Sequence, residues 1–223
     1  MSTIQANHHA EMLEKPAKDS TNDVFSPSVW RALAAEYLVQ LGIGRVDRQA
    51  RLDAFSLLHH VKGYAFSYGD PSRGIVQCPG NVGVAPTVWF PVPDDEPYSS
   101  FADMDARYLT ANEHMFVSDE HCDDHPVFSH AENVMFRAWH DAGHLAHGLG
   151  FSANDEVELF RRSATQADRD GRIMTRAAAR ALFSESVYQL AAAHVLGDFP
   201  ATQTVAALGP VGQRLFDELV EAL

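Results

Sequence analysis

The chain has 223 residues, 46% of them hydrophobic, and 17 Lys and Arg stand against 30 Asp and Glu, which gives a formal net charge of −13. This length and apolar content allow one full-sized domain with its own core. The acidic balance argues against direct binding to duplex nucleic acid. No stretch approaches the ~18 consecutive apolar residues of a membrane span, and the N-terminus lacks a signal-peptide core. We therefore expect no membrane partner and a cytoplasmic protein.

Two helices are predicted near the N-terminus. Ser26 and Pro27 are a favourable helix start, with Ser as N-cap and Pro in the first turn. Apolar residues then recur with the helical period at Trp30, Leu33, Ala34, Tyr37, Leu38 and Leu41. A second helix, over about residues 47–61, is predicted to bury Leu52 and Phe55, with Leu58 or His59 as a further candidate. It is predicted to pair with the first helix as an antiparallel hairpin.

The rest of the chain is predicted to continue the same domain. Residues 63–97 are rich in Gly, Pro and β-branched residues, which indicates a small β-hairpin or a long ordered loop. Helical periodicity resumes at 101–109 and extends to a last helix at 202–223. Residues 1–24 are polar and unpatterned, as in a disordered tail. We therefore expect a mainly α-helical single domain over 25–223, a helical bundle with a small β or loop insertion.

One predicted helix combines a polar stripe with an apolar remainder. At about 100° per residue, five polar side chains between residues 133 and 147 share one side of this helix. They are Asn133, Arg137, His140, His144 and His147. The other positions are mostly apolar, so the helix is expected to be buried, and its polar stripe then needs partners inside the fold. A bound metal ion is the simplest such partner.

The spacing within this stripe indicates how a metal could be held. His140 and His144 are one helical turn apart, so two imidazoles can bind one ion. The helical zinc-protease motif also has a Glu between its histidines, which is absent here. Asp141 would orient an imidazole or act as a base. Asn133 and Arg137 would bind an anionic or carbonyl group of a substrate.

A first pair of candidate carboxylates follows in the next predicted helix, over residues 155–162. Glu156 and Glu158 lie in its first turn, where each either points inward or complements the helix dipole. An earlier segment, residues 119–130, contains three His among several Asp and Glu. That segment has the composition of a metal site but no regular spacing, and we interpret it as a solvated acidic loop.

A third candidate carboxylate lies in a predicted helix over about residues 175–195. Glu185 and Gln189 are one turn apart among small and apolar neighbours, so both are expected to be buried. A buried carboxylate is seldom left without a partner. Either a metal ion or Arg137 would satisfy Glu185.

These motifs resemble an uncharacterised family of phage- and virus-encoded proteins. The resemblance covers about residues 115–205 and rests on several blocks in the same order. They are Asp124-His-Pro126, Asn133, Phe136-Arg137-x-x-His140-Asp141, His144, Gly150-Phe-Ser152 followed by Glu158, Ala181-Leu-Phe-Ser-Glu185-Ser-x-x-Gln189 and Gly197-Asp-Phe-Pro200. The family often has one more residue between the two histidines. The resemblance favours Glu158 over Glu156 as a ligand and implies the cytoplasm of a phage-infected host. The family has no established activity, so it defines the site but not the reaction.

The segment Ala138-Trp-His-Asp-Ala-Gly-His144 also resembles the His-Asp-x-Gly-His signature of HD phosphohydrolases. In that family Asp141 would itself bind the metal and the substrate would be a nucleotide phosphate. The resemblance also requires an earlier histidine on a separate helix. His114, His121 or His125 would have to supply it, and none of them begins an obvious amphipathic helix.

The sequence thus predicts a metal-dependent enzyme that acts on a small-molecule or nucleotide-type substrate. Iron, manganese or zinc suits a site of histidines and carboxylates. The predicted ligands are His140, His144, Glu158 and Glu185, and the predicted catalytic residues are Asn133, Arg137, Asp141 and Gln189. Such ligands on buried helices are typical of di-iron bundles, so a nonhaem iron oxygenase is favoured, although the usual Glu-x-x-His repeat is absent. The alternatives are an HD-like phosphohydrolase and a non-enzymatic virion or interaction protein with a structural polar core.

Overall fold

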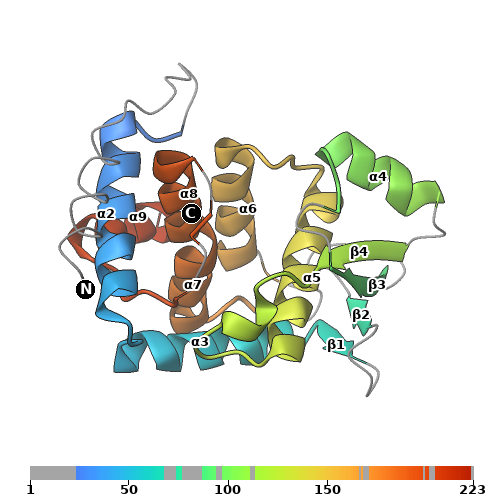
Figure 1. Cartoon of the computed structure of the whole chain (residues 1–223), viewed down its shortest axis with the longest axis horizontal. Helices are drawn as coiled ribbons and strands as arrows, with labels where there is room; N and C mark the ends of the chain where they lie inside the picture. The colour runs from blue at the N-terminus through green and yellow to red at the C-terminus, as the bar shows by residue number, and fades with distance from the viewer. Residues whose placement is uncertain are drawn as a thin grey trace.

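The fold was analysed in a computed structural model. It describes residues 24–67, 74–76, 87–93, 97–110, 114–165, 167, 171–197, 199–200 and 204–221. Apart from residue 24, the predicted N-terminal tail lies outside these ranges. The described chain is mainly α-helical with one small β-sheet, as the sequence predicts (Figure 1). None of the described helices has the length and apolarity needed to cross a membrane.

Helix α2 (Pro27–Ile43) confirms the first predicted helix. Ser26 is its N-cap, and its core face contains Trp30, Leu33, Ala34, Tyr37 and Leu38. The predicted antiparallel hairpin with the next helix is not formed. In Figure 1, α3 (Arg48–Val61) runs across one end of the bundle, packed against α7, while α2 lies along α8.

The buried face of α3 differs from the predicted one. Leu52 and Phe55 are 50% and 48% exposed, so the prediction that they are buried was wrong. Of the further candidates, Leu58 is buried and His59 is exposed. The helix packs against α7 (Arg176–Phe183), and its buried residues include Asp53 with Ala50 and Ala54. Arg180 donates two hydrogen bonds to the Asp53 carboxylate, at 2.8 and 2.9 Å. The buried face of α3 is thus a different apolar stripe from the predicted one, and Asp53 is tolerated within it because Arg180 pairs with its carboxylate. The members of this stripe are Ala50, Ala54, Leu57, Leu58 and Val61.

The single helix predicted over residues 175–195 contains an irregular turn. It consists of α7, a π-helical turn (Ser184–Tyr188) and α8 (Gln189–Leu196). A π turn is wider than an α turn and is frequent at functional sites. All five residues of the turn are buried, and Ser186 donates its hydroxyl to the Leu182 carbonyl at 2.7 Å. The wider turn rotates α8 relative to α7 and so changes which side chains of α8 face the neighbouring helices.

The last helix, α9 (Pro210–Glu221), begins later than predicted. Its N-terminus is capped from α2, because Glu36 accepts the backbone N–H groups of Val211 at 2.9 Å and Gly212 at 3.0 Å. Tyr188 donates its hydroxyl to the same carboxylate at 2.6 Å. The buried end of this helix is thus satisfied by a side chain that is remote in sequence.

Helix α5 (His130–His147) lies between the helical bundle and the sheet (Figure 1). Ser129 and Glu132 form a capping box at its start, and Gly148, with φ of +61°, ends it. Helix α6 (Ala153–Thr165) follows after a short turn and packs against both α5 and α7. These two helices supply the first group of site residues.

The sheet has the order β1-β2-β3-β4. Its strands are β1 (Ala65–Ser67), β2 (Gly74–Val76), β3 (Thr87–Val92) and β4 (His114–Ser118). The first three are antiparallel and fall within the predicted insertion, whereas β4 is parallel to β3 and was not predicted. Helix α4 (Phe101–Thr110) crosses between them. After β4 the chain passes through residues 119–121 and a 3-10 turn (Cys122–Asp124) and so reaches the site.

Candidate metal centre and adjoining cavity

Two histidines of α5 and one glutamate of α6 form a compact group of potential metal ligands. Glu156 Oε2 lies 3.2 Å from His140 Nε2, and Glu156 Oε1 lies 3.2 Å from His144 Nε2. The three ligand atoms lie within 4.8 Å of one another. Small side-chain rotations would bring them to the ~2.0–2.2 Å that nitrogen and oxygen ligands keep from a shared ion. We call His140, His144 and Glu156 the metal triad.

The ring orientation of His144 suits a metal ligand. Its Nδ1 lies 3.2 Å from the Leu149 carbonyl oxygen, which can only accept, so Nδ1 carries a hydrogen and the neutral ring has its lone pair on Nε2. Nε2 lies 3.2 Å from a carboxylate oxygen of Glu156 and is buried without a hydrogen-bond partner among the described residues. A metal ion or a proton between the neutral imidazole nitrogen and the carboxylate oxygen would remove the repulsion between these two electron-rich atoms. A histidine that donates from one nitrogen to a carbonyl and binds metal through the other is the usual arrangement.

His140 is oriented in a similar way. Its Nδ1 lies 3.6 Å from the Asp141 carboxylate, and its Nε2 faces Glu156. Burial opposes protonation of His140, but the negative charges of Glu156 and Asp141 outweigh burial and raise its pKa to about 10. Burial likewise works against ionisation of Glu156, and the neighbouring His140 nevertheless lowers the pKa of that carboxyl. Without a metal, a proton on His140 thus takes the place of the cation.

The structure places Glu156, not the predicted Glu158, in the metal triad. Glu158 accepts hydrogen bonds from Arg161 at 2.8 and 3.0 Å and from Arg162 at 2.7 Å. These bonds, led by that from Arg161, lower the pKa of Glu158 to about 2. Residues two apart lie on different sides of a helix, so only one of the two glutamates can face α5. The arginines at i+3 and i+4 were the sequence signal for a surface ion pair.

Glu185 lies outside the metal triad and has a different set of partners. His125 Nε2 lies 3.3 Å from its Oε1, and Gln189 donates to its Oε2 at 2.9 Å. His125 Nδ1 accepts the backbone N–H of Phe128 at 2.7 Å, so the ring hydrogen is on Nε2 and points to Glu185. The predicted alternative partner of Glu185, Arg137, makes no ion pair with it at 4.0 Å or less.

His125 is a partner of Glu185 that the sequence analysis named only as a possible first histidine of an HD-like site. It belongs to the segment interpreted as a solvated acidic loop, yet its side chain is 0% exposed and its ring stacks on Phe128 with centroids 4.2 Å apart. The loop interpretation was therefore wrong for this residue. Only contacts between remote segments reveal its position, because no regular spacing links His125 to Glu185.

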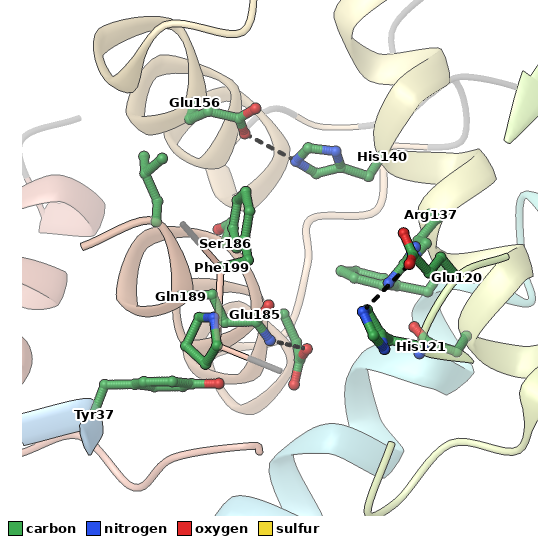
Figure 2. Close-up of a pocket in the computed structure, with 14 residues that line it drawn as sticks. Tyr37, Glu120, His121, Arg137, His140, Glu156, Glu185, Ser186, Gln189 and Phe199 are labelled. Carbon is green, nitrogen blue, oxygen red and sulfur yellow. Dashed lines mark hydrogen bonds and ion pairs between the residues drawn. The ribbon is translucent and has the colours of Figure 1, made fainter. Parts of the chain in front are cut away.

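A cavity of about 260 Å³ adjoins the metal triad (Figure 2). Five predicted site residues line it, namely Asn133, Arg137, His140, Glu185 and Gln189. Glu156 also lines the cavity. His144 and Asp141 are not among the lining residues: His144 lies behind, next to Glu156, and Asp141 lies next to Nδ1 of His140. His121 contributes from the loop after β4 with φ of +57°, a conformation that non-glycine residues seldom adopt and that is common at functional sites.

Comparison of the chain with protein families, with curated proteins and with solved structures gives no match. The function is therefore argued from the geometry of the metal triad and the cavity.

Proposed function

We propose that the protein is a metal-dependent enzyme in which His140, His144 and Glu156 bind one divalent ion. The observation that carries this proposal is the buried Nε2 of His144, which faces the Glu156 carboxylate without a hydrogen-bond partner among the described residues. A structural polar core would be expected to satisfy such an atom by a hydrogen bond. An ion among the three ligand atoms would satisfy it and would neutralise the partly buried carboxylate of Glu156.

We infer that the reaction class is nonhaem iron oxidation. Two histidines and one carboxylate, with the remaining positions open, are the ligand set of nonhaem Fe(II) oxygenases. Bound iron would supply the activation of dioxygen, which no side chain provides. The cavity beside His140 and Glu156 offers room for a substrate next to those open positions. Asp141 would keep the His140 ring oriented from the Nδ1 side.

A second candidate function is hydrolysis at a zinc-type centre. The same ligand set also occurs in zinc hydrolases, where an activated water attacks the substrate. The observation that favours this candidate is Glu185, a buried carboxylate in the same cavity that His125 and Gln189 hold in place. A base positioned in this way can accept a proton from water. An HD-like site is less compatible with the geometry, because Asp141 lies at Nδ1 of His140, away from Glu156.

Metal content measured on untagged protein tests the proposal. Wild-type protein should carry about one ion per chain, and His140→Ala, His144→Ala and Glu156→Ala should each lose it. Glu158→Gln is the matched control, because it changes a glutamate of the same helix that is bonded to two arginines. Full metal content in Glu156→Ala would overturn the proposal.

The identity of the metal and the reaction class need a further measurement. Protein loaded anaerobically with Fe(II) should consume dioxygen faster than the same protein loaded with zinc and faster than free Fe(II). Tight zinc binding with no oxygen consumption by the iron form would favour the hydrolytic candidate. If neither metal binds, the polar core is structural.

A further inference from the structure

Two opposite charges line the cavity without pairing with each other. Arg137 comes from α5 and Glu185 from the π-helical turn, and Figure 2 shows them on different walls. In the described part of the chain these two residues form no ion pair, which means that their charged atoms are more than 4.0 Å apart. Opposite charges in a partly buried site attract strongly, so the fold must hold them apart.

Arg137 is held by neutral groups. Its Nη1 donates to the Ser118 carbonyl oxygen at 3.2 Å and lies 3.4 Å from the Ser118 hydroxyl, at the end of β4. Within the described residues, no carboxylate comes within ion-pair distance of its guanidinium. Glu120, another acidic residue of the cavity, has His121 at 3.6 Å. The remaining N–H groups of the planar guanidinium are suited to two parallel bonds with a carboxylate.

Glu185 is likewise held by neutral donors. The tautomer of His125 fixed by Phe128 leaves that imidazole uncharged, and Gln189 is an amide. Burial, and then the negative charge of Glu185, raise the pKa of Tyr37, which lines the same wall. A buried carboxylate with only neutral partners gains most from a cationic or strongly donating group.

We propose that the cavity binds a small molecule that carries a carboxylate at one end and an ammonium or hydroxyl group at the other. The carboxylate binds Arg137 and the donor group binds Glu185. The middle of the molecule passes the apolar lining, which includes Phe136, Leu190 and Pro200. The volume of about 260 Å³ is below the ~300–1,000 Å³ of pockets for drug-sized ligands, so the molecule is small. That this molecule lies beside a metal ion rests on the proposed function. Its binding to Arg137 and Glu185 does not require the metal.

Calorimetric titration of the full chain with simple probes tests this proposal, with and without added zinc. The probes are the ω-amino acids from glycine to 6-aminohexanoate, the matching ω-hydroxy acids, the unsubstituted acids, the simple amines and inorganic phosphate. One chain length of amino or hydroxy acid should bind at least about 10-fold more tightly than the acid or the amine that lacks one end. Equal binding of phosphate and of unsubstituted acids would overturn the proposal and show a plain oxyanion site.

Variants separate the two ends of the molecule. Arg137→Gln should weaken the best probe by about 10-fold or more, and Arg137→Lys should weaken it less, because charge remains while the planar fork is lost. Glu185→Gln should remove the preference for amino acids over unsubstituted acids. Arg107→Gln is the matched control, because Arg107 binds Asp103 on the exposed side of α4.

The controls keep this proposal distinct from the proposed function. If Arg137→Gln does not fold, as judged by circular dichroism, Glu185→Gln and Arg137→Lys still decide the outcome. Unchanged probe affinity in both would overturn the assignment. Full metal content with no probe binding would reject the ligand class alone, whereas probe binding without metal binding would reject the metal triad alone.

Discussion

Leu149 holds the ring of His144 through its backbone, because its carbonyl oxygen lies 3.2 Å from Nδ1 of that histidine. The chain can place this carbonyl there because Gly148 reverses direction at the end of α5 with φ of +61°, and the Leu149 N–H returns to the His144 carbonyl at 3.1 Å. A helix C-cap thus fixes the hydrogen position on a candidate metal ligand.

Gly148→Ala should therefore weaken metal binding as well as the fold. A β-carbon at this φ costs about 1–2 kcal/mol of stability, and displacement of Leu149 should weaken metal affinity about 10-fold or more. Gly44→Ala is the matched control, since Gly44 caps α2 with φ of +68° and neither position has an atom within 4 Å of the added carbon. Both should lower the unfolding midpoint in urea, and only Gly148→Ala should raise the Kd for metal. An equal effect on metal affinity would contradict the role of Leu149.

Metal binding should release protons at neutral pH. The pKa of His140 is raised from 6.5 to about 10 in the metal-free fold, so its pair with Glu156 stabilises that fold fully below pH ~6.5 and ceases to do so as the pH rises through 10. The metal must displace this proton, so its affinity should rise with pH, by up to about 10-fold per unit, until about pH 10. Calorimetry in two buffers of different ionisation enthalpy should show about one proton released per ion at about pH 8. Binding without proton release would mean that His140 is not a ligand.

Gly212→Ala should strongly destabilise the protein. A β-carbon at Gly212 would lie 1.8 Å from the hydroxyl oxygen of Tyr188, which Glu36 holds in place. We expect a loss of about 3 kcal/mol in the free energy of unfolding, measured in urea. Gly143→Ala is the comparison, because its β-carbon would meet only a flexible Leu159 methyl group at 3.0 Å and Ala favours the helix. A similar loss in both variants would show that the Tyr188 contact is unimportant.

Asp53→Ala should destabilise the junction between α3 and α7. The Asp53 side chain is 7% exposed, and its removal leaves the Arg180 guanidinium without its partner. Loss of one member of a buried ion pair costs about 3–5 kcal/mol. Glu218→Ala, which breaks an exposed pair with Arg214, should change the urea midpoint little. A small effect of Asp53→Ala would mean that apolar packing alone sets the face of α3.

Local patterns predicted the helix positions well and the helix neighbours poorly. Ser26 with Pro27, and Gly148, mark helix ends through backbone chemistry that depends on nearby residues only. The inward face of α3 depends on Arg180, which is 127 positions away from Asp53. Such pairings become visible only when the packing of the helices is known, so the exposed Leu52 and Phe55 were assigned to the wrong side.

The part of the candidate site that lies on a single helix was predicted, and the part that depends on helix packing was not. The stripe of Asn133, Arg137, His140 and His144 follows from one helix, so its spacing alone brings these residues together. Glu156 and His125 come from other segments, and their roles depend on how α6 and the loop before α5 pack. The arginines beside Glu158 were a local signal that could have shown its outward position.

The π-helical turn at residues 184–188 also has a consequence for how this protein could evolve. A π turn contains one residue more than the α turn it replaces, so it corresponds to a single-codon insertion within an otherwise regular helix. Loss of that one residue would restore a regular helix while α7 kept its contact with α3. Glu185 and Gln189 would then no longer face the cavity together. One small deletion would therefore remove this wall of the cavity, and retention of the π-helical turn is the feature to look for in any relative that keeps the candidate site.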